Sequence, residues 1–346
     1  MTRHYTSRLD LQHGVVELTH GGGGRAMAQL VDELFVRALD NPLLARLNDQ
    51  ACFEVPAGRM VMATDSHVVT PLFFPGGDIG SLAVHGTVND VAMAGARPLY
   101  LSAAFILEEG FPLAELARIV DSMARASRDA GVPVVTGDTK VVERGKADGL
   151  FITTTGVGVV PPGVEISGDR ARPGDRILVN GTLGDHGIAI MASRENLDFG
   201  APVVSDSAAL HGLVAAMVAS GADLRCLRDP TRGGLAATLN ELAQQSGVGM
   251  LLDEASLPVR EPVRACCEFL GLDPLNVANE GKLVAICPAA DADRLLAAMR
   301  AHPLGRDAAL IGEVVADDHA FVEMQTAFGG RRMVDWLSGA QLPRIC

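Results

Sequence analysis

The chain has 346 residues, and its 42 acidic and 29 basic side chains give it a formal net charge of −13. A negative charge of this size, with no run of Lys or Arg, argues against nucleic-acid binding, since phosphate backbones would be repelled. No apolar stretch reaches the roughly 20 residues that a membrane helix needs, and the first residues lack the apolar segment of a secretion signal. We therefore expect a cytoplasmic α/β protein, and its length predicts two domains.

The first half of the chain alternates predicted strands and helices. A glycine run at residues 21–24 precedes an amphipathic segment over about 27–39. Strands are then expected over 60–64, 99–107, 132–135 and 150–160, with helices over about 81–94 and 112–130. This alternation favours an α/β sandwich in the first domain.

The second half repeats the pattern after two segments rich in Pro and Gly, 161–163 and 172–175. Helices are predicted to begin near 185, 207, 233, 262 and 291, and strands are predicted over about 176–180, 248–252, 283–287 and 309–315. The last residues contain a proline and no helical pattern, which predicts a mobile tail. The expected organisation is a glycine-rich arm (1–45), two α/β domains (46–165 and 170–338) and the tail (339–346).

Three aspartates lie at the edges of predicted strands and helices. Asp65 follows a buried strand, Asp138 follows another strand through a glycine, and Asp90 lies at the edge of a helix. Carboxylates in such positions collect Mg²⁺, which prefers oxygen ligands and also takes substrate phosphates. The set predicts a metal–nucleotide site, whereas each aspartate alone could equally cap a helix or a turn.

The glycine run is a second phosphate signal. Gly21, Gly22, Gly23 and Gly24 could bring backbone N–H groups close to a phosphate, but no Gly-Lys-Ser/Thr follows, so the run is not a Walker A loop. A glycine run taken alone is more often a flexible linker.

The polar stretch Asn279-Glu280-Gly-Lys282 comes just before an apolar strand. Glu280 and Lys282 pressed against a buried strand would have shifted pKa values, as general acids and bases do, and an ordinary surface turn is the alternative. Asp78 lies in a glycine loop and is either a further metal ligand or a turn residue.

The cysteines form no CxxC pair and no regular framework, so reduced thiols are expected. They are Cys52, Cys226, Cys266, Cys267, Cys287 and Cys346. Cys346 differs from the others because it is the last residue of the sequence. On a mobile tail it buries nothing, and only an activating site would make it a strong nucleophile.

Short motifs are spread over the whole chain. They are Thr64-Asp65-Ser66, Pro75-Gly-Gly-Asp78-Ile-Gly80, Gly86-Thr-Val-Asn89-Asp90, Gly137-Asp138-Thr-Lys140 and Asp229-Pro-Thr-Arg-Gly-Gly234. Together they resemble the ATP-binding superfamily of aminoimidazole ribonucleotide synthetase, selenophosphate synthetase and thiamine-monophosphate kinase. Four further motifs are similar to the HypE family of hydrogenase maturation factors: His20-Gly-Gly-Gly-Gly24, Gly184-Asp-His-Gly187, Asn279-Glu-Gly-Lys282 and the final Pro343-Arg-Ile-Cys346.

The resemblance implies a PurM-like fold of two α/β domains. The N-terminal domain would pair with that of a second subunit and close a shared β-barrel, so a homodimer is expected. It also implies an ATP-dependent dehydration of an S-carboxamide on Cys346 to a thiocyanate. The carbamoyltransferase HypF would add the carbamoyl group, and a HypC–HypD complex would receive the cyanide for the iron of a [NiFe]-hydrogenase.

The resemblance also assigns roles to residues. Mg²⁺ and the triphosphate of ATP would lie on Asp65, Asp90 and Asp138, with Asn89 close by, and the glycines at 21–24 would fold over the nucleotide.

The implied catalytic residues are Lys140, which would stabilise phosphate charge, Glu280, which would remove the amide proton, and Cys346. Two alternatives stay open. A superfamily member that phosphorylates a free small molecule would not need the tail, although a selenophosphate synthetase would carry a reactive cysteine near its N-terminus and the first one here is Cys52. A non-catalytic scaffold that presents a cysteine tail would not turn over ATP.

Overall fold

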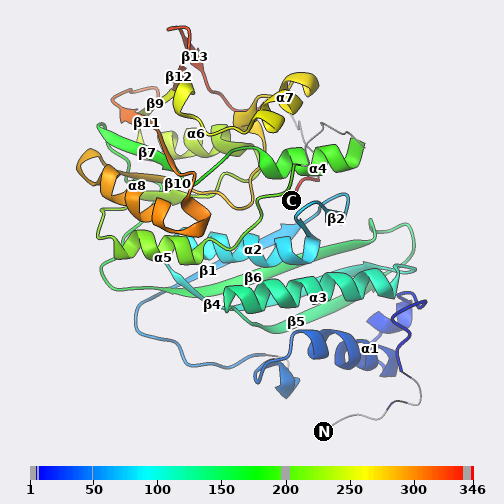
Figure 1. The fold of residues 1–346 in the computed structure, drawn as a ribbon. Helices are drawn as coiled ribbons and strands as arrows, with labels where there is room; N and C mark the ends of the chain where they lie inside the picture. Colours follow the sequence, from blue (N-terminus) through cyan, green and yellow to red (C-terminus); the bar gives the residue numbers. More distant parts are fainter. Residues whose placement is uncertain (1–4, 6–7, 49, 196–202, 338–343) are drawn as a thin grey trace.

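The computed structural model describes residues 5, 8–48, 50–195, 203–337 and 344–346. Its two halves each combine a sheet with helices, and the C-terminal residues lie between the halves (Figure 1). The expected two-domain α/β fold is confirmed. In the part of the chain that the structure describes, no helix combines the length and apolar character that a membrane span requires.

The N-terminal half is built on a four-stranded sheet in the order β1-β6-β4-β5, in which β4 and β5 are parallel and the other neighbours are antiparallel. Helices α2 and α3 pack together on one face of it. The elements are β1 (Arg59–His67), β2 (Phe73–Phe74), β3 (Gly77–Asp78), α2 (Ile79–Ala92), β4 (Arg97–Glu108), α3 (Leu113–Ala130), β5 (Val134–Val142) and β6 (Leu150–Val160).

Helix α2 lies close to the sheet because the contact between them contains glycines, on β6 and on α2 itself. A Cβ on Gly156 of β6 would lie 2.9 Å from the Thr87 side chain. A Cβ on Gly86 of α2 would lie 3.0 Å from the His67 ring and 3.5 Å from a carboxylate oxygen of Asp65. This close packing sets the middle of α2 directly beside the end of β1.

The opposite face of the sheet carries exposed apolar side chains. Met60 and Met62 on β1 are 58% and 70% exposed, and Ile106 on β4 is 41% exposed. Because side chains alternate along a strand, these three project away from α2 and α3. An apolar sheet face of this kind is typical of a surface that a second layer covers.

The N-terminal arm packs beside β5. It contains η1 (Leu18–Gly21), α1 (Arg25–Leu30), the π-helical η2 (Val31–Val36) and η3 (Leu44–Arg46). The ring of Phe35 lies 4.8 Å from that of Phe105, and a Cβ on Gly21 would lie 2.7 Å from the Val141 backbone nitrogen. The glycine run therefore lies alongside β5, at the edge of the sheet that is farthest from β1.

The C-terminal half contains a seven-stranded mixed sheet in the order β13-β12-β9-β11-β7-β10-β8. Its central strands β7 and β10 are almost entirely buried, and helices cover the sheet. The elements are β7 (Asp175–Val179), α4 (Asp185–Glu195), α5 (His211–Ala219), β8 (Cys226–Arg228), α6 (Gly234–Ser246), β9 (Gly249–Asp253), α7 (Glu261–Leu270), β10 (Val284–Pro288), α8 (Ala292–Ala301), β11 (Ala309–Val315), β12 (Val322–Gln325) and β13 (Arg331–Met333).

Three differences from the sequence-based expectation matter for the site. Strands β1 and β5 continue to His67 and Val142, so Asp65 and Asp138 both lie inside their strands instead of following them. The short strands β12 and β13 carry no strong strand pattern and were not predicted. Of the tail that was expected to be mobile, Arg344–Cys346 is seated between the two halves, and residues 339–343 lie outside the described residues.

Candidate active site

The last three residues of the chain lie between the two halves, next to the residues that follow β1. The Val68 N–H donates to the Cys346 carbonyl oxygen at 3.1 Å, and the Thr70 N–H donates to the Arg344 carbonyl oxygen at 3.2 Å. The Ile345 side chain is 2% exposed and belongs to the core of the N-terminal half. The tail is therefore part of the packed structure at its end.

This position brings the Cys346 thiol beside the Glu280 carboxyl. Burial, followed by the neighbouring Asp229, Asp206 and Asp65, raises the pKa of Glu280 well above its usual value. Burial and the nearby Glu280 also raise the pKa of the Cys346 thiol well above its usual value. The surroundings therefore favour the protonated form of both groups when no cation is bound.

Two more carboxyls share the cleft. Burial, together with Asp229 and Asp65, raises the pKa of Asp90 to about 8. Burial, with a smaller contribution from Asp65, raises the pKa of Asp229 to about 6. Asp65, Asp90, Asp229 and Glu280 form one group, which we call the acidic cluster, and each half of the molecule contributes two of its members.

The acidic cluster fits a divalent cation. Among the described residues, no three Asp, Glu, His or Cys side chains are already arranged as metal ligands. However, the Oε1 atom of Glu280 is buried and has no hydrogen-bond partner in the described part of the chain. Carboxyl oxygens that repel one another, one of them without a partner, suit the hard oxygen coordination that Mg²⁺ prefers.

Asn279 fixes the loop that carries Glu280. Its side chain is fully buried, its Oδ1 accepts from the Gly184 N–H at 2.8 Å, and its Nδ2 donates to the Pro230 carbonyl oxygen at 2.9 Å. One amide thus joins three of the motifs noted in the sequence. Because buried amides must satisfy both their donor and their acceptor, the three loops are held in one arrangement.

Asp206 supports Glu280 from the other side. Its carboxylate accepts from the Glu280 backbone N–H at 3.1 Å and from the Lys282 Nζ at 2.8 Å, in an ion pair that is nearly buried. A Cβ on Gly281 would lie 1.8 Å from the Asp206 carbonyl oxygen, so only glycine fits between the two. Lys282 therefore pairs with a structural aspartate instead of facing the cysteine.

Asn89 does not take the role expected for it. Its Oδ1 accepts from the Leu210 N–H at 2.7 Å, and its Nδ2 donates to the carbonyl oxygens of Ala208 at 3.0 Å and Glu280 at 3.2 Å. These contacts use both donors and the acceptor on backbone groups of the C-terminal half. Asn89 therefore joins α2 to the other half and holds the Glu280 backbone, contrary to the expectation that it lies against the nucleotide.

Asp138 and Lys140 are also placed differently from the expectation. The register across the sheet sets Asp138 in one row with Ser66, so Asp138 and Asp65 project from opposite faces. Three strand spacings, about 14 Å, separate β5 from β1. Lys140 lies 2.7 Å from Asp138, and its hydrogen bond holds the pKa of that carboxyl below its usual value.

The predicted metal-ligand set is therefore corrected for a single chain, where Asp138 is not a neighbour of Asp65 and Asp90. The glycine run lies with Asp138, because Gly23 and Asp138 line the same cavity, of about 370 Å³, beside Phe35. We call the glycine run, Asp138 and Lys140 the glycine-arm group. Within one chain it lies apart from the acidic cluster.

Asp78 is a turn residue of the N-terminal half. Its Oδ1 accepts from the backbone N–H groups of Gly80 at 2.8 Å and Ser81 at 3.1 Å, and the Ser81 hydroxyl lies 3.1 Å from the Asp78 backbone nitrogen. This is a capping box at the start of α2. Asp78 fixes where the helix begins and is not a member of the acidic cluster.

Sequence reasoning missed Asp229 and Asp206. Asp229 follows directly after β8, and it belongs to one of the motifs used for the family resemblance. The rule that carboxylates gather where strands end could therefore have found it. Asp206 lies in a segment without a recognisable pattern, so only the fold shows its contact with Glu280.

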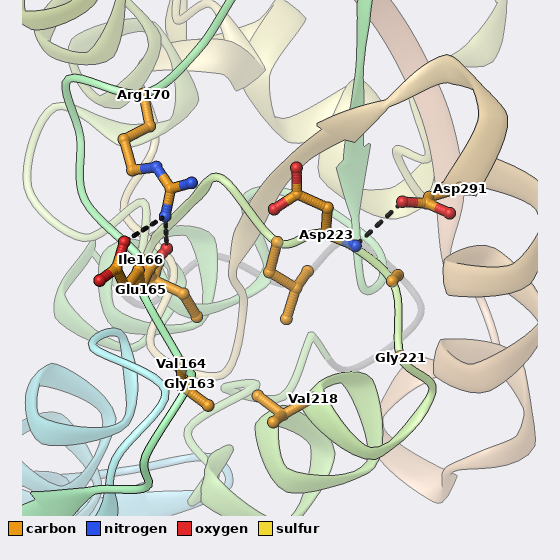
Figure 2. Close-up of a pocket in the computed structure, with 11 residues that line it drawn as sticks. Gly163, Val164, Glu165, Ile166, Arg170, Val218, Gly221, Asp223 and Asp291 are labelled. Atoms are coloured by element: carbon orange, nitrogen blue, oxygen red, sulfur yellow. Dashed lines mark hydrogen bonds and ion pairs between the residues drawn. The ribbon is translucent and has the colours of Figure 1, made fainter.

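A cavity of about 440 Å³ lies away from this site, where the linker between the halves meets the end of α5 (Figure 2). Arg170 and Glu165 pair at its edge, and the Asp223 N–H donates to Asp291 at 3.0 Å. None of the residues expected to bind the nucleotide, and none of the acidic cluster, lines this cavity.

Comparisons with known proteins agree with the geometry. Residues 47–160 match the family model "AIR synthase related protein, N-terminal domain", and residues 172–325 match the model of its C-terminal domain. The chain is 75% identical to the carbamoyl dehydratase HypE of Azotobacter vinelandii, over 98% of this chain and 100% of that protein. The chain belongs to the HypE family.

Solved structures of HypE proteins are similar throughout. One HypE in complex with ATP superimposes with a TM-score of 0.92 at 53% identity, covering 95% of this chain and 99% of that one. A HypE in a HypE–HypF complex superimposes with a TM-score of 0.79 at 49% identity, covering 89% of this chain and 99% of that one. The family resemblance expected from the motifs is confirmed.

Proposed function

We infer that this HypE-family chain is an ATP-dependent carbamoyl dehydratase that converts an S-carboxamide on its own Cys346 into a thiocyanate. The observation that carries this inference is the position of Cys346, whose thiol lies beside the buried Glu280 carboxyl of the acidic cluster. A kinase for a free small molecule would leave that place open to its substrate. The activity named for the 75% identical relative supports the same reaction.

The proposed chemistry follows from the position of the Cys346 sulfur beside the Glu280 carboxyl. The carboxamide oxygen attacks the γ-phosphorus of ATP, and ADP leaves. The O-phosphorylated intermediate then loses its N–H protons and its phosphate as the C≡N bond forms. The carboxamide and ATP thus give the thiocyanate, ADP, phosphate and a proton. Glu280 is placed to accept an N–H proton, because its carboxyl lies against the sulfur that bears the carboxamide.

We propose that Asp65, Asp90 and Asp229 hold Mg²⁺, with Asp229 in the place first expected for Asp138. The support is their shared cleft, their mutual repulsion and the raised pKa values of Asp90 and Asp229. When bound, the ion supplies positive charge that stabilises the triphosphate and favours the ionised form of the nearby carboxyls.

We propose that two chains form a homodimer through the open faces of their N-terminal sheets. The exposed Met60, Met62 and Ile106 support this arrangement, since a closed barrel would bury them. Pairing β5 of one chain with β1 of the other would place Asp138 and Lys140 one strand spacing, about 4.8 Å, from the strand of Asp65. Asp138 and Lys140 would then face the inside of the barrel with Met60 and Met62, while the glycine run at the same sheet edge would lie next to β1 of the partner chain.

We also propose the partners and the compartment. A solved HypE–HypF complex supports HypF as the source of the carbamoyl group. A HypC–HypD complex would receive the cyanide for the iron of a [NiFe]-hydrogenase, because a thiocyanate needs an acceptor that takes its cyanide from sulfur. The cysteines are free thiols in the structure, as expected for the cytoplasm. The boundaries 1–45, 46–165, 170–338 and 339–346 are retained, since the two sheets fall on either side of the linker.

The test follows the mass of the C-terminal peptide after incubation with HypF, carbamoyl phosphate and ATP. Carbamoylation of the thiolate adds about 43 Da, and dehydration then removes about 18 Da. Chain that is already carbamoylated, freed of HypF and given ATP, should show the second step alone. ATP hydrolysis with no adduct on Cys346 would exclude the dehydratase and favour a phosphotransferase. An adduct that never loses water would favour a scaffold.

A further inference from the structure

We propose that α4 is the docking helix for the C-terminal tail, and that His186, Ile190 and Arg194 are the positioning residues that hold Cys346 at the acidic cluster. The proposal rests on the function inferred above and adds residues that act through the tail. The three residues are spaced four apart, so they lie along one face of α4.

His186 directs its only donor at the tail. Its ring is fully buried, and its Nε2 lies 2.7 Å from the Ile345 carbonyl oxygen. Because a carbonyl oxygen only accepts, Nε2 carries the hydrogen, and Nδ1 accepts from the Ser205 hydroxyl at 2.8 Å. The ring also packs edge-on against Phe74, with centroids 5.5 Å apart. The imidazole is thus fixed in one tautomer and one orientation.

Arg194 acts at the other end of the helix. Its Nη2 donates to the Arg344 carbonyl oxygen at 2.8 Å and to the Thr70 carbonyl oxygen at 2.7 Å, and its Nε donates to the same Thr70 oxygen at 3.0 Å. The Thr70 N–H itself donates to the Arg344 carbonyl oxygen. One guanidinium group therefore binds the tail and the segment after β1 together.

Ile190 lies on α4 between the two residues that make these polar contacts. It is fully buried and belongs to the same hydrophobic core as Ile345, with Cys346 packed against that core. The two polar contacts satisfy the carbonyl oxygens of Arg344 and Ile345, and the shared core buries the Ile345 side chain. Together they fix the position and the direction of the tail between the two halves.

This arrangement predicts opposite effects on the two reactions of Cys346. Carbamoyl transfer needs the thiol outside the cleft, where the transferase can reach it, whereas dehydration needs the carboxamide inside. Weaker contacts with α4 shift the population of the tail toward the released state. They should therefore make the free thiol easier to modify and the carboxamide slower to dehydrate, which a general loss of folding would not do.

The experiment compares Arg194→Met and His186→Phe, which remove the donors, with His186→Gln, which keeps an amide donor near the position of Nε2. Glu195→Gln, an exposed position on the same turn as Arg194, is the matched control. Each ATP-free protein is treated with iodoacetamide, and the C-terminal peptide is followed by mass spectrometry because Cys52 is also exposed. Single-turnover dehydration of purified carbamoylated chain is measured in parallel.

Removing one hydrogen bond should lower the ratio of docked to released tail about five- to tenfold, with nucleotide affinity unchanged. The factor by which alkylation of Cys346 speeds up and the factor by which dehydration slows should multiply to that value. His186→Gln should recover part of both effects, and Glu195→Gln should match the wild type. Wild-type rates in folded Arg194→Met and His186→Gln, or alkylation and dehydration that fall together, would overturn the proposal. If wild-type carbamoylated chain does not dehydrate, the inferred function is wrong, while the alkylation rates still test the docking helix.

Discussion

At the residue scale, Glu280 is buried, lies beside the reacting cysteine and is repelled by neighbouring aspartates. Glu280→Gln keeps the shape and removes the proton acceptor. We expect carbamoylated Cys346 to accumulate, with dehydration slowed by a factor on the order of 100 to 10,000. ATP binding should change little, because Glu280 is not among the proposed metal ligands. Intact mass after a single turnover and nucleotide titration measure both, and normal dehydration by the variant would remove Glu280 from the mechanism.

Asp90 gives a prediction about pH. Its pKa is about 8 in the folded chain without metal, whereas the ordinary group has a pKa of 3.8. Between these two pH values Asp90 is protonated in the folded state and ionised in the unfolded state. Stability that depends on the proton is present at low pH and is lost as the pH rises through about 8. Asp90→Asn should therefore raise the melting temperature of the metal-free protein at pH 8 by about 2–4 °C and reduce the rise that Mg²⁺ produces.

Thermal unfolding at pH 5 and pH 8, with and without Mg²⁺, measures this effect. Asp318→Asn, at an exposed position outside the cleft, is the control and should leave all four melting temperatures unchanged. If metal-free Asp90→Asn melts below the wild type at pH 8, then repulsion from Asp229 and Asp65 does not destabilise the folded protein through Asp90.

Individual residues were predicted well where their role is local. Glu280 and Cys346 were chosen from a polar stretch and from the end of the sequence, and the structure brings them into contact. Asn89 was misjudged because its partners come from the other half, more than 100 positions along the chain. Asp229 was missed as a member of the acidic cluster because the three-residue strand β8 before it was not predicted.

At the scale of elements, the loop of residues 279–282 depends on a glycine. A Cβ on Gly281 would lie 1.8 Å from the Asp206 carbonyl oxygen, and backbone cannot move away cheaply. Gly281→Ala should destabilise the protein by about 2–4 kcal/mol, in the range of strongly overpacked sites, and should slow dehydration by shifting Glu280.

Gly24→Ala is the matched control for that variant. A Cβ there meets nothing within 4 Å, and its φ is negative, so the melting temperature should stay close to that of the wild type. Denaturant unfolding compares the two. Equal stability of Gly281→Ala and Gly24→Ala would show that the loop of residues 279–282 adapts to the added Cβ.

Element positions were largely predictable, because buried strands and amphipathic helices have clear periodicity. The end of β5 was not, since Gly137 suggests a turn where the strand in fact continues beside β4. That error had a consequence, because an aspartate after a strand can turn toward a site, whereas one inside a strand must project from a face of the sheet. Asp138 was therefore grouped with the wrong neighbours.

At the scale of the whole molecule, the open face of the N-terminal sheet predicts the oligomeric state. Met62→Asp places a charge at an exposed position, so the chain should fold, but a dimer that buries this face should separate into monomers. Phe328→Asp, at the fully exposed tip of the β12–β13 hairpin, is the matched control and should stay dimeric. Light scattering after size exclusion gives the masses, and an unchanged dimer in Met62→Asp would place the interface elsewhere.

The hydrogen bonds between Asn89 and the backbone of Ala208, Leu210 and Glu280 join one half of the chain to the other. The position of the proposed catalytic glutamate therefore depends on both halves. Chimeras that exchange whole halves between relatives would thus depend on how well a foreign α2 meets these backbone groups. The activity of such hybrids would therefore report how well α2 of one half fits the backbone of the other half, more than how well either half folds.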